Sequence, residues 1–136
     1  MKIRWLCVPA VVAGFLFMVG GQAYAADGKP DVSKDEFLAI AKKSGCLACH
    51  SIDKKIVGPP WSLVSQDEKN MSYADAMKRE EHQIINGGKG KWVKVTGGVP
   101  MPPYGPRVKD ADRKKLADFI VNIAKVENLP YKKRPE

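Results

Sequence analysis

Two cysteines and a histidine within five residues carry the most specific chemical signal in this sequence. Residues 46–50 read Cys-Leu-Ala-Cys-His, so Cys46 and Cys49 lie three positions apart and His50 follows directly. This pattern is the attachment signature of a c-type haem. Each thiol can add to one vinyl group of the same porphyrin, and the imidazole then becomes the proximal ligand of the iron. The segment therefore predicts one covalently bound haem c, with iron as its metal.

Zinc binding and dithiol redox chemistry are the alternatives for a Cys-x-x-Cys pair. A tetrahedral zinc ion needs four ligands. Beyond residues 1–25 the only Cys and His residues are Cys46, Cys49, His50 and His82. Cys49 and His50 are sequence neighbours, which is awkward for two ligands of one tetrahedral ion. A thioredoxin-like dithiol should accompany a βαβ pattern, which this sequence lacks. Haem attachment is the favoured interpretation.

The second iron ligand must come from the remaining Met and His residues, unless that position is open. Met77 is explained by core packing, and His82 by solvation beside two glutamates. Met71 has no neighbours that would fix its backbone. Met101 lies in Val-Pro-Met-Pro-Pro, where three prolines restrict the chain around a soft thioether. We expect Met101 to be the sixth ligand, which raises the reduction potential and leaves no site for oxygen, peroxide or nitric oxide.

The two ends of the chain differ from its middle. Residues 1–25 have a basic start, an apolar run and an Ala-x-Ala site, which predicts a secretory signal peptide cleaved before Ala26; a retained anchor is the alternative. Residues 126–136 form a basic tail. Removing Lys2 and Arg4 with the leader lowers the formal net charge from +8 to +6. That charge favours acidic protein partners or an anionic surface.

Helical periodicity dominates the segment between these ends. Three helices are predicted: one after the Ser33 cap, one over 72–85 and one over 110–125. The polar middle of the second helix, 78–82, is expected to face water. Residues 92–96 are the only β-leaning stretch and predict at most a short hairpin arm. Rigid Pro- and Gly-rich loops separate the helices.

These motifs together resemble the small bacterial class I cytochromes c. The resemblance covers residues 33–125. It is carried by the Cys-x-x-Cys-His segment after a short helix, Gly58-Pro59, Ile85-Asn86-Gly87, Trp92, the Pro100-Met101-Pro102-Pro103 loop and the last helix. It implies an all-α cytochrome c fold over 26–125, with three to five helices wrapped around one covalent haem and the first and last helices crossing.

The resemblance also implies roles for individual residues. The Pro59 carbonyl should accept a hydrogen bond from the far nitrogen of His50 and so orient the imidazole. Trp92 should donate its indole N–H to a haem propionate, with Trp61 as a rival. The expected cofactor-binding residues are thus Cys46, Cys49, His50, Met101, Pro59 and Trp92, with His50 and Met101 on the metal.

The function expected from this resemblance is single-electron transfer in the periplasm, not catalysis. Partners would be respiratory or periplasmic redox proteins with acidic docking faces, steered by Lys54, Lys55, Lys89, Lys91 and Lys94. Nucleic-acid binding and stable membrane insertion of the mature chain are not expected, and a monomer is. The alternatives are a dedicated cytochrome subunit of an exported oxidoreductase, and an open-haem gas binder or peroxidase.

Overall fold

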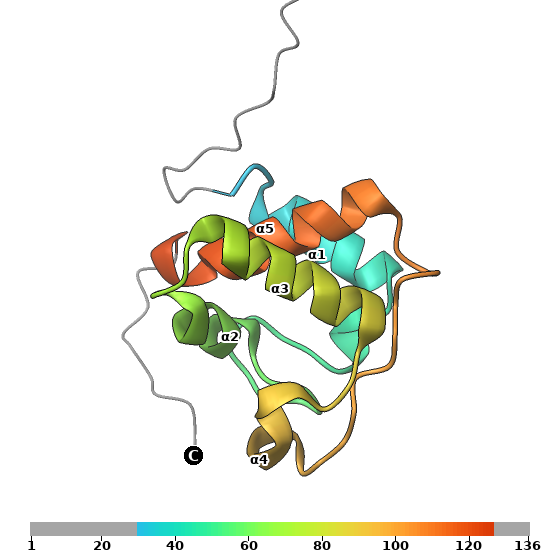
Figure 1. The fold of residues 1–136 in the computed structure, drawn as a ribbon. Helices are drawn as coiled ribbons and strands as arrows, with labels where there is room; N and C mark the ends of the chain where they lie inside the picture. Colours follow the sequence, from blue (N-terminus) through green and yellow to red (C-terminus); the bar gives the residue numbers. More distant parts are fainter. Residues whose placement is uncertain (1–29, 127–136) are drawn as a thin grey trace, which may run out of the picture.

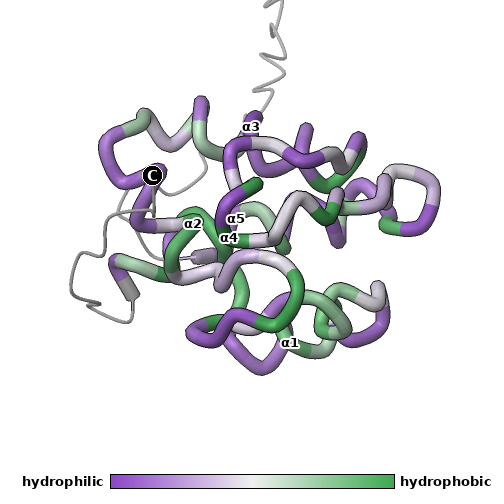
Figure 2. Tube along the Cα trace, turned by 90° about the horizontal axis from the view of Figure 1, so that it is seen from below, coloured by the Kyte–Doolittle hydropathy of each residue, from purple (hydrophilic) through white to green (hydrophobic). Residues whose placement is uncertain are grey.

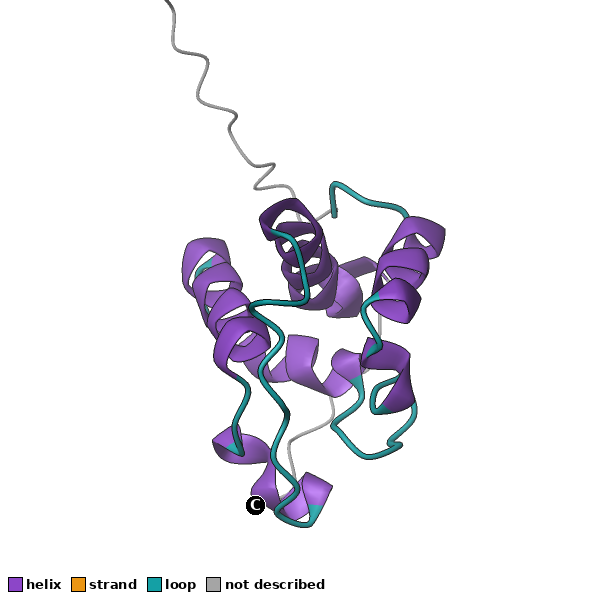
Figure 3. Ribbon diagram, turned by 90° about the vertical axis from the view of Figure 1, so that its right-hand side faces the viewer, coloured by secondary structure: helices purple, strands orange, loops and turns teal. Residues whose placement is uncertain are grey.

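Helices and loops make up the described part of the chain. The computed structural model describes residues 30–126. The expected signal peptide and, apart from position 126, the expected tail lie outside this range. Within it no strand forms (Figure 3), and an isolated bridge joins Gly88 to Met101. The elements are α1 (Lys34–Lys43), η1 (Cys46–Ala48), α2 (Trp61–Glu68), α3 (Tyr73–Asn86), η2 (Gly90–Trp92), α4 (Val93–Thr96) and α5 (Asp110–Val126).

Helix α5 is the centre of the arrangement. It packs against α1, α2 and α3, and α1 crosses behind it in Figure 1. The caps expected for the first two long helices are present. The Ser33 hydroxyl accepts the backbone N–H of Glu36 at 3.2 Å, and the Ser72 hydroxyl accepts that of Asp75 at 3.1 Å. These bonds satisfy donors that a helix start leaves unpaired. The all-α class predicted from the sequence, with the first and last helices in contact, is therefore confirmed.

Aromatic side chains fill the crossing of the first and last helices. Phe37 of α1 is fully buried and stacks on Phe119 of α5, with ring centroids 4.3 Å apart. Its other contact is an edge-on one to Trp61, at 4.9 Å. Burial of such rings is the largest single contribution that side chains make to a small core. In Figure 2 hydrophobic and hydrophilic stretches alternate along the helices, as expected where one face of each helix is buried.

Polar groups buried beside α5 fix its neighbours in place. The Ser65 hydroxyl of α2 donates to the Val121 carbonyl and accepts the Ala124 N–H, both at 2.9 Å. The Asp118 carboxylate accepts hydrogen bonds at 2.6 Å from the Asp31 N–H and the Tyr73 hydroxyl. Such buried groups are stable because each finds a partner. They join the segment before α1, helix α2 and the start of α3 to the same helix.

Two sequence predictions about local structure were wrong. Residues 92–96 form the end of η2 and all of α4, because Gly97 in a left-handed conformation (φ 65°) closes a helical turn instead of a hairpin. The middle of α3 does not face water throughout, because Glu80 is only 8% exposed. Helix α2 was not predicted, since its eight residues begin at Trp61, directly after Pro60, which offers no side-chain cap.

The described residues contain no helix with the length and apolar character needed to cross a membrane.

Candidate haem-binding site

A tight turn after α1 presents the two thiols. Gly45 takes a left-handed conformation (φ 80°), which ends the helix and starts η1 at Cys46. The N–H groups of Cys49 and His50 both bond to the Cys46 carbonyl, at 3.1 and 3.0 Å. Both cysteines are free thiols, Cys46 buried and Cys49 half-buried, and both line one cavity. The turn therefore places both haem-attachment candidates on the wall of a single pocket.

The His50 imidazole is held from two sides. Its Nδ1–H donates to the Pro59 carbonyl at 2.9 Å, the contact that the resemblance led us to expect. Its ring stacks on Trp61, with centroids 5.4 Å apart and planes at 9°. Gly58 adjoins it closely, since a Cβ there would lie 2.3 Å from His50 Cε1. Burial lowers the pKa of His50, and the Pro59 bond opposes part of that shift. The ring is thus a neutral imidazole with Nε2 uncommitted to these contacts, the form that binds metals.

Met101 enters the same cavity from a loop tied to the end of α3. Its backbone exchanges two hydrogen bonds with Gly88, at 2.8 and 2.9 Å, and the Tyr104 N–H donates to the Ile84 carbonyl at 2.9 Å. Gly87 makes this approach possible, because a Cβ there would lie 2.2 Å from the Met101 carbonyl oxygen. The Gln83 amide is 3.9 Å from Met101 Sδ. The Asn-Gly-Gly stop of α3 is therefore also the docking point of the methionine loop.

The other ligand candidates are placed away from this arrangement. Met77 is buried in the core, as expected, and His82 is exposed. Met71 contacts Arg79, with Nη1 3.5 Å from its sulfur. None of these three lines the cavity, whereas Met101 does.

Both tryptophans of the described chain line the cavity, in different roles. Trp61 is buried and stacks on His50, so its contacts are with the proximal wall. Trp92 is half-buried at the junction of η2 and α4, and Lys91 Nζ lies 5.8 Å from its ring centroid. Sequence reasoning had favoured Trp92 for the cofactor and missed the contact of Trp61 with His50. The sequence feature that could have indicated this contact is the position of Trp61, two residues after Pro59, whose carbonyl orients His50.

One charged residue on the cavity wall was not anticipated. Glu80 lines the cavity together with mostly apolar side chains and Gln83. Its position in the polar run 78–82 gave no sign of burial. Only the packing of α3 against its neighbours turns this one carboxyl inward.

The donor set of the cavity fits a haem c. Two free thiols, an imidazole with Nε2 uncommitted and a thioether line one largely apolar space, which is what a covalent porphyrin requires. Among residues 30–126, no three His, Cys, Asp or Glu side chains group in a way that could hold a metal ion by themselves.

Comparison with known proteins agrees with this site. The cytochrome c family profile matches residues 38–124. Cytochrome c-552 of Nitrosomonas europaea is 36% identical over 124 residues, covering 90% of this chain and 99% of the relative. Cytochrome c-552 of Hydrogenobacter thermophilus is 40% identical over 84 residues, covering 62% and 78%. The crystal structure of wild-type N. europaea cytochrome c552 aligns with a TM-score of 0.54 at 37% identity, covering 62% of this chain and 95% of that one.

Fold and site together define an all-α haem protein built for electron transfer. The chain belongs to the cytochrome c family, as a small class I member. Membership implies a covalently bound haem c, and Cys46 and Cys49 fit its attachment motif. The family resemblance stated from the sequence is confirmed, and with it the general function of a haem-based electron carrier.

Proposed function

We propose that this protein is a periplasmic single-electron carrier with its iron held between His50 and Met101. The observation that carries the proposal is that an oriented imidazole and a backbone-anchored thioether line one cavity beside two free thiols. The haem supplies one-electron exchange between ferric and ferrous iron. With His50 and Met101 both bound to the iron, substrates would have no access to the metal, so the protein would pass electrons and do no bond chemistry.

The protein residues have distinct tasks in this scheme. Pro59 fixes the His50 ring through Nδ1 and so presents Nε2 to the metal. The Gly88 bridge fixes the backbone of Met101, and rigid ligands reduce the reorganisation that accompanies electron transfer. Trp92 is proposed to donate its indole N–H to a propionate. The apolar lining keeps water from the metal, which is one of the means by which a protein sets a haem potential.

The sulfur-to-iron absorption band in the near infrared of the ferric protein tests the ligation. Met101→Leu should abolish that band and let the reduced protein bind carbon monoxide. Met71→Leu is the matched control, because it makes the same substitution outside the cavity and should leave the band intact. A wild-type protein that lacks the band, or that binds carbon monoxide tightly when reduced, would exclude the carrier and favour an open-haem function.

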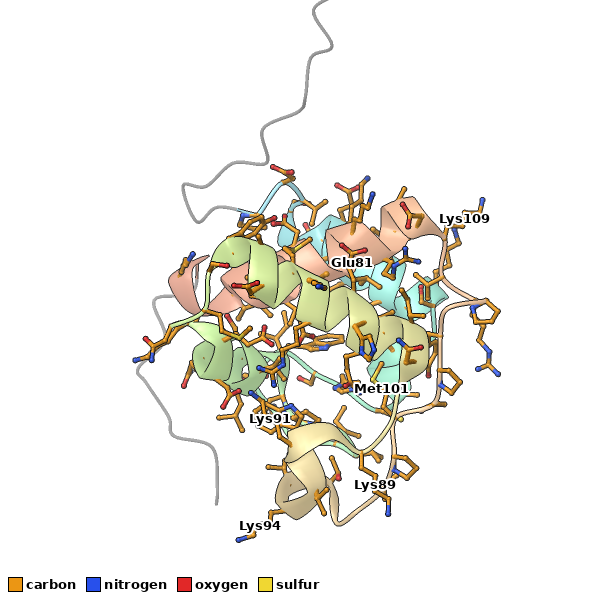
Figure 4. The ribbon with its side chains drawn as sticks, viewed as in Figure 1. Glu81, Lys89, Lys91, Lys94, Met101 and Lys109 are labelled. Atoms are coloured by element: carbon orange, nitrogen blue, oxygen red, sulfur yellow. The ribbon has the colours of Figure 1, made fainter. Side chains whose placement is uncertain are left out.

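The proposed docking face surrounds the opening of the cavity. Val57 and Val99 line the cavity and are also 38% and 49% exposed. Lys89 lines it as well, and Lys89 and Lys94 project from the lower edge of the molecule in Figure 4. Lys54 and Lys55 are exposed, whereas Lys91 is paired with Asp67. An apolar centre with a basic rim suits an acidic redox protein, since opposite charges speed encounter.

Electron-transfer rates measured against ionic strength test this face. With an acidic one-electron acceptor protein, the second-order rate should fall as salt rises, because exposed charges are screened. Lys89→Gln should lower the rate at low salt. Lys109→Gln is the control, because this exposed lysine lies before α5, at the opposite end of the molecule from Lys94 in Figure 4. Equal rates for both variants, or a rate independent of salt, would contradict the proposal.

Export is tested by the mass of the mature protein. Periplasmic material should begin at Ala26 and carry the added mass of one haem. A chain that retains residues 1–25 in the membrane fraction would instead support an anchored form.

A further inference from the structure

Two buried glutamates meet between α2 and α3, beside the haem cavity. Glu68, the last residue of α2, is 3% exposed, and Glu80 in the middle of α3 is 8% exposed. Glu80 also lines the cavity that holds His50 and Met101. Carboxyls are rarely buried unless they are paired, because burial penalises the charged form. Neither glutamate has a part in the function proposed above.

The surroundings of Glu68 favour a proton shared with Glu80. Among the described residues no N–H group donates to either of its carboxyl oxygens. The carboxyl of Glu80 is its interaction partner. Two carboxylates are both acceptors, so a hydrogen bond between them exists only when one carries a proton. Arg79 Nε, 3.3 Å from Glu68 Oε1, supplies the compensating charge.

A count of charges around the pair leads to the same result. Asp67 is the third acid of the group; it pairs with Lys91 and lies 3.9 Å from Arg79 Nη1. Among the described residues, these contacts set three carboxyls against Arg79 and Lys91. Their charges balance when one carboxyl keeps its proton, and net charge is costly where solvation is poor.

Burial and mutual repulsion act on the proton affinity in the same sense. Burial, followed by the charge of Glu80 and the bond to it, raises the pKa of Glu68 to about 9. Burial likewise raises the pKa of Glu80. The proton therefore stays on the pair at neutral pH, and the two residues titrate as a unit.

Two charged groups that α5 brings against α3 have partners other than the pair. From α5, Arg113 pairs with Glu81, and Asp118 accepts from Tyr73. The titratable side chains on the cavity wall, besides Glu80 and the two cysteines that become thioethers, are His50, Lys89 and Tyr104. The cofactor adds its own propionates, which the experiment below must separate from the pair.

We propose that the Glu68–Glu80 pair is a redox-linked proton site, which holds its proton more tightly when the haem is reduced. The inference rests on the proposed electron-carrier function. When a donor protein delivers one electron, the charge in the cavity falls by one unit, so the adjacent pair gains proton affinity and takes up part of a proton from water. Passing the electron to an acceptor protein returns that proton to water. Linkage makes the effect reciprocal: ionising the pair favours the oxidised state.

Redox titration of the haem-loaded protein across pH tests the proposal. In the wild type, the ratio of reduced to oxidised protein at a fixed applied potential should fall as pH rises, by at most tenfold per pH unit, or about 59 mV. Glu68→Gln and Glu80→Gln should each remove this fall. Glu81→Gln is the matched control, since it removes the same charge from the neighbouring residue, which pairs with Arg113. Infrared difference spectra between the two redox states should show a protonated-carboxyl signal that is absent from the Glu68 and Glu80 variants.

The possible outcomes distinguish failure of the proton site from failure of the proposed electron-carrier function. A pH dependence equal in all four proteins would assign it to the propionates or another group and overturn the proposal. A wild-type potential independent of pH would overturn it as well. The near-infrared sulfur-to-iron band is recorded on the same samples. If the band is present and substitution of Glu68 or Glu80 leaves the pH dependence unchanged, only the proton site is excluded. If the band is absent, the proposed function itself is excluded.

Discussion

The two walls of the haem cavity are held in place by different means. On the proximal wall, His50 is fixed by side-chain contacts: its bond to Pro59, its stacking on Trp61, and through Trp61 an aromatic chain to Phe37. On the distal wall, Met101 is fixed almost entirely by backbone bonds to Gly88, while its sulfur has one long contact with an amide. The first wall is part of the hydrophobic core, and the second is a loop fastened to a helix end. Stability and ligation should therefore respond to different substitutions.

The largest expected effect comes from breaking the aromatic chain. Phe37→Ala removes a fully buried ring that contacts both Phe119 and Trp61, so the free energy of unfolding should fall by about 3–5 kcal/mol. The sulfur-to-iron band of the folded fraction should persist, because the Met101 backbone bonds are untouched. Denaturant unfolding, followed by the haem absorption, measures the free energy of unfolding. Near-infrared spectra of the same protein measure the sulfur-to-iron band. Loss of the band in folded protein would show that the walls are not independent.

On the distal wall we expect a smaller loss of stability, together with a change in the sulfur-to-iron band. Gly87→Ala places a Cβ against the Met101 carbonyl in a backbone region that favours glycine (φ 64°), so the loop must move away. We expect weakening or loss of the sulfur-to-iron band, with a stability cost of about 1–3 kcal/mol.

A matched glycine provides the control for that distal-wall test. Gly97 has nearly the same φ (65°), and a Cβ there meets nothing within 4 Å. Gly97→Ala should cost stability through strain alone and keep the band. If both variants lose the band equally, strain in the loop, and not contact with Met101, is responsible.

The smallest effect, taken over one pH unit, concerns the contact between the helices of the two walls, where Glu68 of α2 meets Glu80 of α3. The folded protein holds a proton on Glu68, whose pKa is about 9, whereas the unfolded chain releases it near the ordinary value of 4.5. More protons are then bound in the folded state across this window, so the free energy of unfolding should fall as pH rises through it. One group contributes at most about 1.4 kcal/mol per pH unit. Unfolding by denaturant at several pH values should show a shallower fall in Glu68→Gln than in Glu81→Gln.

The sequence revealed the cofactor because covalent chemistry imposes a spacing. Cys46 and Cys49 lie close along the chain, as attachment of one porphyrin requires, and the proposed ligand His50 follows directly. The prolines around Met101 are equally local. Three of the helices were readable from periodicity and caps. Helix α2 was not, since eight residues without a side-chain cap give too little pattern. The turn at 92–96 was misjudged because β-branched residues favour strands only when a partner strand exists to pair with them.

The sequence by itself determined the haem, its attachment residues and the helical class, because each depends on residues near one another in the chain. Only the tertiary structure decided what surrounds them. The stacking of Trp61 on His50, the bridge from Gly88 to Met101 and the inward turn of Glu80 each join segments that are distant or differently patterned. Burial depends on which faces other helices cover, and a polar run such as 78–82 carries no local mark of the one carboxyl that packing encloses.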